Sequence, residues 1–194
     1  MKDRMSSHIQ RSIDVKSAIL NDTEFLALVE QAAQLCADAL QNGKKILFAG
    51  NGGSASDAQH LSAELVGRYK FDRASLAAIA LTTDTSALTA IGNDYGYDQV
   101  FSRQVSGLGQ EGDVLVAIST SGNSANILKA CDVAEEKGLK IIGMSGAKGK
   151  LKEQADICLA VPAPETATIQ EAHIMLGHII CDGIEQILFP ELNS

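Results

Sequence analysis

The chain has 194 residues, 45% of them hydrophobic and 21% charged, which are the proportions of an ordinary globular domain. Its 24 acidic and 16 basic side chains give a net charge of −8 at pH 7. This acidity argues against nucleic-acid binding, because a phosphate backbone requires clustered Lys and Arg. No apolar run is long enough to span a membrane, and the N-terminus is too polar for a signal peptide. We therefore expect one domain, residues 1–194, in the cytoplasm, with no nucleic-acid and no membrane partner.

An N-terminal helical segment of about residues 1–42 contains two patterns of apolar residues at helical spacing. The first includes Ile9 and Ile13, four residues apart. The second begins at Asp22 or Thr23, either of which can cap a helix, and an Asn-Gly pair ends it. We expect two helices here, preceding the sheet.

Five short apolar runs follow, and each is bounded by turn residues or by a helical pattern. They do not alternate between apolar and polar residues, which is typical of parallel strands buried on both faces. A final helix is expected from about Thr166 to Leu188, ended by Pro190. The sequence predicts an α/β fold, a three-layer sandwich around a five-stranded parallel sheet, with extra N-terminal helices. The predicted strands are residues 45–49, 76–81, 114–119, 140–145 and 157–161.

Two loops of similar composition follow the first and third predicted strands. The first reads "GNGGSAS" (residues 50–56) and the second "STSGNSAN" (residues 119–126), and each leads into a predicted helix. Glycine lets the backbone approach a ligand, hydroxyl side chains donate hydrogen bonds, and a helix N-terminus adds unpaired N–H groups. A phosphate is therefore the expected ligand. In a doubly wound sheet ordered 2-1-3-4-5 the two loops would face each other across one pocket.

Other interpretations of these loops remain open. Gly, Ser and Asn are also ordinary turn and capping residues. A nicotinamide site is a weaker alternative, because "GNGGSA" lacks the G-x-G-x-x-G spacing and no acidic residue closes the second strand.

The candidate reactive residues lie on the helices after the first loop and at the C-terminus. His60 and Glu64 are four residues apart, so they share one helix face and could bind a metal or act as acid and base. A surface salt bridge would explain the same pair. The last helix carries Gln170, His173 and His178, of which one histidine could serve packing alone. Gln170 and His178 are about 12 Å apart along the helix, so they either approach a ligand from opposite sides or come from different subunits.

Four segments together resemble the motifs of the sugar isomerase (SIS) domain superfamily, and most closely those of the phosphoheptose isomerase family. They are "GNGGSASDAQHLSAELVGRY", "GNDYGYDQVFSRQVSGLG", "EGDVLVAISTSGNSANILKA" and "IQEAHIMLGH". The resemblance covers nearly the whole chain. It implies a flavodoxin-like sheet order 2-1-3-4-5, a homotetramer with active sites between subunits, and conversion of D-sedoheptulose 7-phosphate to D-glycero-D-manno-heptose 7-phosphate. That reaction would be the first step toward ADP-heptose and the lipopolysaccharide core.

The resemblance also implies roles for single residues. Glu64 and His178 would be the catalytic acid and base. One zinc ion per subunit would be bound by His60, Glu64, Gln170 and His178. Substrate would be bound by Asn51, Gly52, Gly53, Ser54, Glu64, Asn93, Asp94, Ser119, Thr120, Ser121, Ser124 and Gln170. Some members of the family carry an Asp where this chain has Ala167, which puts one polar contact in doubt.

The implied chemistry turns a ketose into an aldose. A base removes a proton from C1, negative charge develops on the C2 oxygen, and a proton returns to C2; a zinc ion would stabilise the enediolate as a Lewis acid. Two alternatives remain: an isomerase of another sugar phosphate, and a non-catalytic SIS-domain adaptor that binds the replication initiator. Such adaptors lack the acid and base side chains, whereas this chain has both Glu64 and His178.

Overall fold

The computed structural model describes residues 1–192. The strands are β1 (Ile46–Gly50), β2 (Ala78–Ala80), β3 (Val114–Ser119), β4 (Lys140–Gly146) and β5 (Ile157–Val161). The α-helices are α1 (Lys2–Leu20), α2 (Thr23–Gln41), α3 (Gly53–Val66), α4 (Thr85–Tyr95), α5 (Ser102–Leu108), α6 (Ala125–Glu136), α7 (Leu151–Gln154) and α8 (Thr166–Leu188). The 3₁₀ helices are η1 (Tyr97–Gln99) and η2 (Pro190–Leu192).

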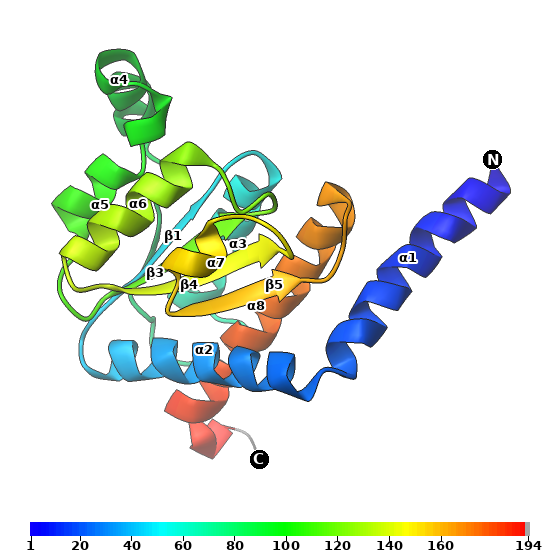
Figure 1. The fold of residues 1–194 in the computed structure, drawn as a ribbon. Helices are drawn as coiled ribbons and strands as arrows, with labels where there is room; N and C mark the ends of the chain where they lie inside the picture. Colours follow the sequence, from blue (N-terminus) through cyan, green and yellow to red (C-terminus); the bar gives the residue numbers. More distant parts are fainter. Residues whose placement is uncertain (193–194) are drawn as a thin grey trace.

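The five strands form one parallel sheet in the order β2-β1-β3-β4-β5, so the predicted fold class and strand order are confirmed. The register places Phe48 beside Val116 and Val116 beside Ile142. Because all strands run the same way, their carboxyl ends meet at one edge of the sheet (Figure 1). The loops after β1 and β3 leave from that edge as neighbours.

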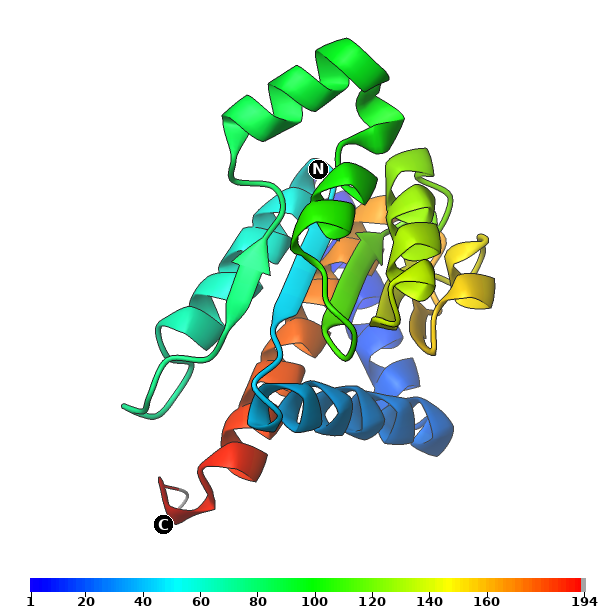
Figure 2. The same ribbon diagram turned by 90° about the vertical axis from the view of Figure 1, so that its left-hand side faces the viewer.

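Helices cover both faces of the sheet, which makes the three layers. On one face, buried side chains of α2, α3 and α8 pack with Ile46 and Phe48 of β1. On the other face, side chains of α5, α6 and α7 pack with Leu47 and Ala49. Successive residues of β1 thus point to opposite layers, and Figure 2 shows the strands with α5 in front of them and α8 behind. The prediction of strands buried on both faces holds for β1, β3 and most of β4.

The same prediction is wrong for β2. It spans three residues rather than the six expected, and Ile79 is 37% exposed. The strand lies at the edge of the sheet, where β1 is its only partner within residues 1–192. The apolar strand β2 is therefore only partly buried, and it is not enclosed within the sheet.

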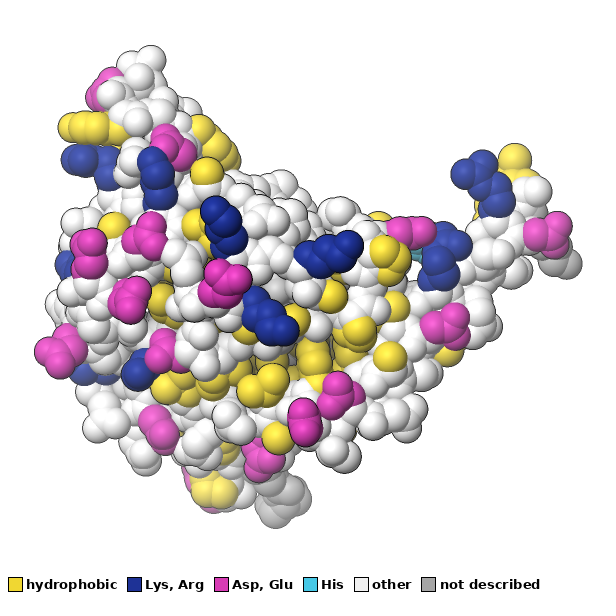
Figure 3. Space-filling view, viewed as in Figure 1, with side chains coloured by type: hydrophobic (Ala, Val, Ile, Leu, Met, Phe, Trp, Pro, Cys, Tyr) yellow, Lys and Arg dark blue, Asp and Glu magenta, His cyan; other side chains and the backbone are white. Residues whose placement is uncertain are grey.

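Two helices extend from the body of the molecule. Ile9 is 61% and Ile13 is 49% exposed on α1, which projects beyond the sheet as an arm (Figures 1 and 3). No residue of α4 is buried, and α4 stands apart above α5 and α6 (Figure 1). On the face drawn in Figure 3 the basic side chains lie scattered among acidic ones, as the acidic composition suggests. None of the described helices is long and apolar enough to cross a membrane.

His173 is fully buried on α8, so it is the histidine that serves packing. Its Nε2 lies 3.1 Å from the carbonyl oxygen of Ser145, and its Nδ1 has no hydrogen-bond partner. Burial lowers the pKa of His173 to about 4, and the hydrogen bond to Ser145 offsets this only in part.

This buried imidazole predicts a loss of stability in acid. Between about pH 6.5 and pH 4 the unfolded chain takes up a proton on His173 while the folded chain does not, so the free energy of unfolding falls by up to about 3 kcal/mol. Above about pH 6.5 the residue is neutral in both states and contributes no pH dependence. Urea denaturation at fixed protein concentration should show this slope in the wild type and a flatter one in His173→Phe. Equal slopes for the two proteins would show that His173 does not titrate in this way.

Candidate active site

Helices α3 and α8 lie side by side on one face of the sheet and carry the candidate reactive residues. A Cβ on Gly177 would lie 2.6 Å from Leu61, so the glycine allows α8 to approach α3 closely. Gly53 of α3 lies against Gln170, and His60 lies against His178. The two helices therefore run in the same direction, and corresponding turns face each other.

His60, Glu64 and His178 form a compact group of ligand atoms. The Nε2 of His60 lies 3.3 Å from Oε1 of Glu64 and 2.8 Å from Nε2 of His178. One ligand atom from each residue lies within 4.8 Å of the other two. The group is open to solvent on one side, since the His60 side chain is 48% exposed. The structure thus brings together, within one chain, three of the four residues expected to bind metal.

This donor set fits a zinc ion. Two imidazole nitrogens and one carboxylate oxygen are typical zinc ligands, and catalytic zinc sites keep a further position open for water or substrate. Here the three side chains converge from two helices and their open side leaves room for such a ligand. A surface salt bridge between His60 and Glu64 alone would not require His178 to join them.

Gln170 lies on α8 eight residues before His178, apart from this group. It is hydrogen-bonded to Asp57 of α3, one turn before His60, and it contacts Gly53. Asp57 is only 8% exposed, and its Oδ2 has no hydrogen-bond partner. Burial raises the pKa of Asp57, while the hydrogen bond from Gln170 and the charge of His60 lower it in part. Within this chain Gln170 and His178 therefore contact α3 at Gly53 and at His60. The two expected arrangements, on opposite sides of a ligand or across subunits, stay predictions.

Gly53 leaves the space that Gln170 occupies. A Cβ at this position would lie 2.1 Å from Nε2 and 2.5 Å from Oε1 of Gln170. Gly53→Ala should therefore displace the end of this flexible side chain from the face between α3 and α8, with little change in the melting temperature. We expect kcat/KM to fall about 10- to 100-fold, the range found for residues that support a metal or catalytic group. Gly107→Ala is the matched control, because nothing lies within 4 Å of its Cβ. Equal activity of the two variants would argue against a role for Gln170.

Tyr69 completes the environment of His178 and was not found from the sequence. Its ring stacks on the imidazole with centroids 5.5 Å apart and an angle of 25° between the planes. The ring of His60 meets the same imidazole edge-on at 5.0 Å. His178 is therefore held between an aromatic ring and the His60–Glu64 pair.

The loop after β3 gathers hydroxyl groups at the start of α6. The Oγ of Ser119 lies 3.0 Å from that of Ser124 and 3.4 Å from that of Ser121. Ser124 is the N-cap residue of α6, yet its side chain makes no capping hydrogen bond. Gly122 has φ 65°, which only glycine adopts readily. The glycine thus serves the turn, whereas the hydroxyls are not used to cap the helix.

A hollow of about 610 Å³ opens beside this loop. Its lining includes Thr120 and Ser121 from the loop and Lys148 from the segment after β4, with the start of α8 on the far side. A hydroxyl-rich helix start with a cationic side chain nearby is suited to a phosphate group. Thr120 and Ser121 line this hollow, whereas Ser119 and Ser124 are not among its lining residues. Phosphate binding by these four residues stays a prediction.

The loops after β1 and β3 touch directly. Asn51 and Asn126 exchange two side-chain hydrogen bonds of 2.8 Å, so the loops are adjacent, as the strand order requires. The 610 Å³ hollow is lined by the second loop and by the segments after β4 and β5, and no residue of the first loop is in its lining. The single pocket expected between the two loops stays a prediction.

Asn93 and Asp94 lie away from both groups of residues. They sit near the end of α4, are exposed, and form a hydrogen bond with each other. The structure therefore gives them no contact with the His60, Glu64 and His178 group within this chain. Their expected sugar contact stays a prediction.

Comparison with known proteins decides the family. Residues 12–146 match the SIS domain family. A protein of Aneurinibacillus thermoaerophilus named phosphoheptose isomerase is 56% identical over 190 residues, which cover 97% of this chain and 96% of that one. The chain belongs to the phosphoheptose isomerase family of SIS domains. A solved phosphoheptose isomerase, GmhA from Neisseria gonorrhoeae, superposes with a TM-score of 0.90 at 49% identity, over 95% of this chain and 98% of that one. A phosphoheptose isomerase from Francisella tularensis gives the same TM-score at 40% identity, over 95% and 97% of the two chains.

Proposed function

We propose that the protein is an aldose–ketose isomerase that converts D-sedoheptulose 7-phosphate to D-glycero-D-manno-heptose 7-phosphate. The observation that carries this proposal is the convergence of His60, Glu64 and His178 within 4.8 Å, in a chain more than half identical to a protein named phosphoheptose isomerase. The loop of Ser119, Ser121 and Ser124 would bind the phosphate. A ketose phosphate bound there could extend its other end toward the α3–α8 face.

In the proposed mechanism the protein moves protons between neighbouring atoms of the sugar. Glu64 takes the proton from C1 and returns it to C2, and His178 moves a proton between the two oxygens. Tyr69 keeps the His178 ring in a fixed plane, because the two rings stack. The negative charge that develops on the C2 oxygen requires an electrophilic group that the site holds in place in advance.

We propose that His60, Glu64 and His178 bind a zinc ion, with Gln170 as the fourth ligand. When bound, the ion would supply a Lewis acid for the enediolate oxygens. Gln170 bonds to Asp57 rather than to the three other residues, so it would need to turn toward the metal. Glu64 would be a metal ligand in one state and the base in another. Its carboxylate has two oxygens that can take these roles.

We further propose a homotetramer. The support is an exposed apolar surface on α1 and α8 that includes Met5, Ile9, Ile13, Ile179 and Ile187. Exposed apolar side chains that recur along one helix face, as Met5, Ile9 and Ile13 do, are expected at a protein–protein contact. The product would feed ADP-heptose and lipopolysaccharide synthesis in the cytoplasm. The four cysteines are free, which suits that compartment.

The adaptor alternative is not favoured, because the chain has both proposed proton-transfer residues, Glu64 and His178. An isomerase of another sugar phosphate is tested by comparing substrates. We expect kcat/KM for sedoheptulose 7-phosphate to exceed that for a six-carbon ketose phosphate, with NMR used to detect the aldose products. Turnover of the six-carbon sugar alone would reassign the substrate. Turnover of neither would favour the adaptor.

A further inference from the structure

A fully buried ion pair lies directly behind the proposed active site. Arg73 Nε donates to Oε1 of Glu185 at 2.8 Å, and both side chains are completely buried. Arg73 belongs to the segment after α3, and Glu185 lies on α8, seven residues after His178. Such a pair is expensive to bury and is kept only when many hydrogen bonds satisfy both groups. The hydrogen bonds of Arg73 and Glu185 therefore indicate what the pair holds in place.

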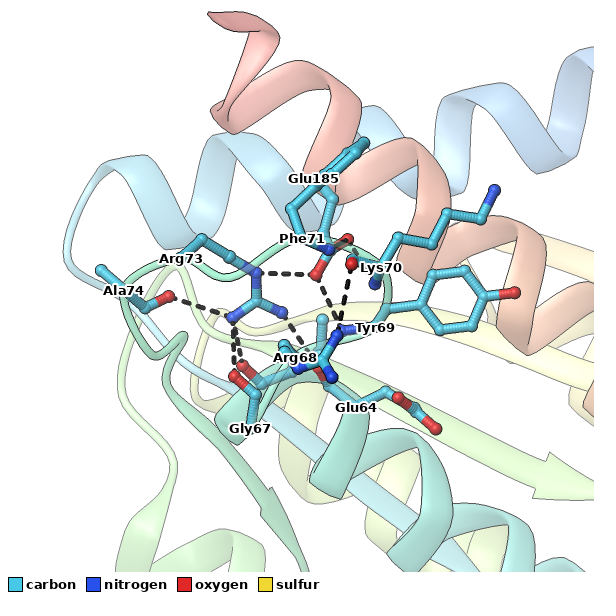
Figure 4. A network of polar contacts seen from close by, with 10 residues as sticks. Glu64, Gly67, Arg68, Tyr69, Lys70, Phe71, Arg73, Ala74 and Glu185 are labelled. Atoms are coloured by element: carbon cyan, nitrogen blue, oxygen red, sulfur yellow. Dashed lines mark hydrogen bonds and ion pairs between the residues drawn. The ribbon is translucent and has the colours of Figure 1, made fainter. Parts of the chain in front are cut away.

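The Arg73 guanidinium binds the end of α3. It donates to the carbonyl oxygen of Glu64 at 2.9 Å and to that of Leu65 at 2.9 Å. Carbonyls in the last turn of a helix lack partners within the helix, and a positive charge there is favourable. Figure 4 shows that the Glu64 carboxylate extends away from Arg73. Arg73 thus holds the backbone of the residue whose side chain joins His60 and His178.

The Glu185 carboxylate binds the next segment of the chain. Its Oε1 accepts from the N–H of Tyr69 at 2.8 Å, and its Oε2 accepts from those of Lys70 at 2.8 Å and Phe71 at 3.2 Å. Burial alone would raise the pKa of Glu185, but these N–H groups and the charge of Arg73 together lower it. With the bond from Arg73 to Oε1, each oxygen of the carboxylate thus accepts two hydrogen bonds.

The two halves of this network hold the two sides of the site. Arg73 binds the turn that carries Glu64, while Glu185 fixes the backbone of Tyr69, whose ring stacks on His178. Figure 4 shows the Tyr69 ring and the Glu64 carboxylate on the same side of the network. Arg73 reaches Glu64 at its backbone carbonyl oxygen and not at its carboxylate, and Glu185 acts on His178 through Tyr69.

We propose that Arg73 and Glu185 are positioning residues, which set Glu64 against His178 at the distance that metal binding and proton transfer require. The proposal rests on the proposed function for its kinetic part. It does not depend on that function for its structural part, since the geometry of His178 can be measured without substrate. A purely structural role for the pair would instead stabilise the fold without affecting the site.

Another buried carboxylate provides a matched control. Asp113, before β3, accepts from the backbone N–H groups of Lys45 and Gln110 and from the Lys45 ammonium. It is fully buried, like Glu185, but it lies at the amino ends of the strands, opposite the site. Glu185→Gln and Asp113→Asn therefore remove the same charge from the same kind of environment.

The test compares these two variants in three measurements below their melting temperatures. For Glu185→Gln we expect kcat to fall at least about 10-fold with KM little changed, and zinc affinity measured by calorimetry to fall about 10- to 100-fold. We also expect the His178 ring signal to shift in the NMR spectrum of metal-free protein, because stacking on Tyr69 changes. The chain has four histidines, so this signal can be assigned by substitution. For Asp113→Asn we expect a lower melting temperature with all three quantities unchanged.

Arg73→Lys is a second variant in case Glu185→Gln does not fold. Lysine keeps the charge beside Glu185 but cannot reach both carbonyls of α3, so the same three changes are expected. A variant that loses stability as Asp113→Asn does, yet keeps wild-type kcat, zinc affinity and His178 signal, would overturn the proposal. If the wild type turns over no ketose phosphate, the proposed function fails, while zinc affinity and the NMR signal still decide the positioning role.

Discussion

Replacing Glu64 by glutamine is expected to lower kcat by about 10²- to 10⁴-fold, the range for loss of one general acid or base. Glutamine keeps the size and shape of the side chain but cannot accept the C1 proton or offer a charged ligand. Glu64 is partly exposed, and its backbone bond to Arg73 does not depend on the side chain. Folding and oligomeric state should therefore be unchanged.

Metal content separates the two roles of Glu64. An inactive Glu64→Gln protein that still binds zinc would indicate proton transfer, whereas loss of both activity and zinc would indicate ligation. Glu136→Gln is the control, because Glu136 is exposed at the end of α6. Wild-type activity in Glu64→Gln would remove Glu64 from the mechanism.

The second large effect concerns the phosphate loop. Ser121→Ala combined with Ser124→Ala should raise KM for the sugar phosphate about 10²- to 10⁴-fold, since each of two hydrogen bonds to a charged group contributes about 1.5–3 kcal/mol. The Ser124 hydroxyl does not cap α6, so stability should change little. Steady-state kinetics will measure the change.

Two comparisons make this result specific. Ser106→Ala on α5, where the serine is exposed, should leave KM unchanged. The unphosphorylated sugar should be turned over equally poorly by the wild type and the double variant. An unchanged KM for the phosphorylated substrate in the double variant would refute the assignment of this loop.

Much of the fold could be predicted because the signals are local. The limits of β3, β5 and α8 agree with the predicted ranges, since turn residues or a proline bound each run. Whether a strand lies at the edge of a sheet depends on the tertiary fold and not on its own residues. The short length of β2 could therefore not be predicted from its apolar composition. The spacing of Ile9 and Ile13 likewise predicts a helix, but it does not indicate that α1 would leave both exposed.

The site residues likewise divide into those that a local sequence pattern predicts and those that depend on tertiary packing. The i, i+4 spacing of His60 and Glu64 predicts their common face, whereas the approach of His178 depends on how α8 packs on α3. That approach requires Gly177 against Leu61, a tertiary contact without a sequence period. Asp57 could have been found, because it lies three residues before His60 on the same helix. Tyr69 could not, because a loop positions it.

The most direct test of the account is NMR of sedoheptulose 7-phosphate incubated with the zinc-loaded protein. We expect the signals of the aldose, D-glycero-D-manno-heptose 7-phosphate, to appear with the wild type and to be absent over the same time with Glu64→Gln. Absence of the aldose with the wild type at every zinc concentration, from a protein shown to be folded, would contradict the account.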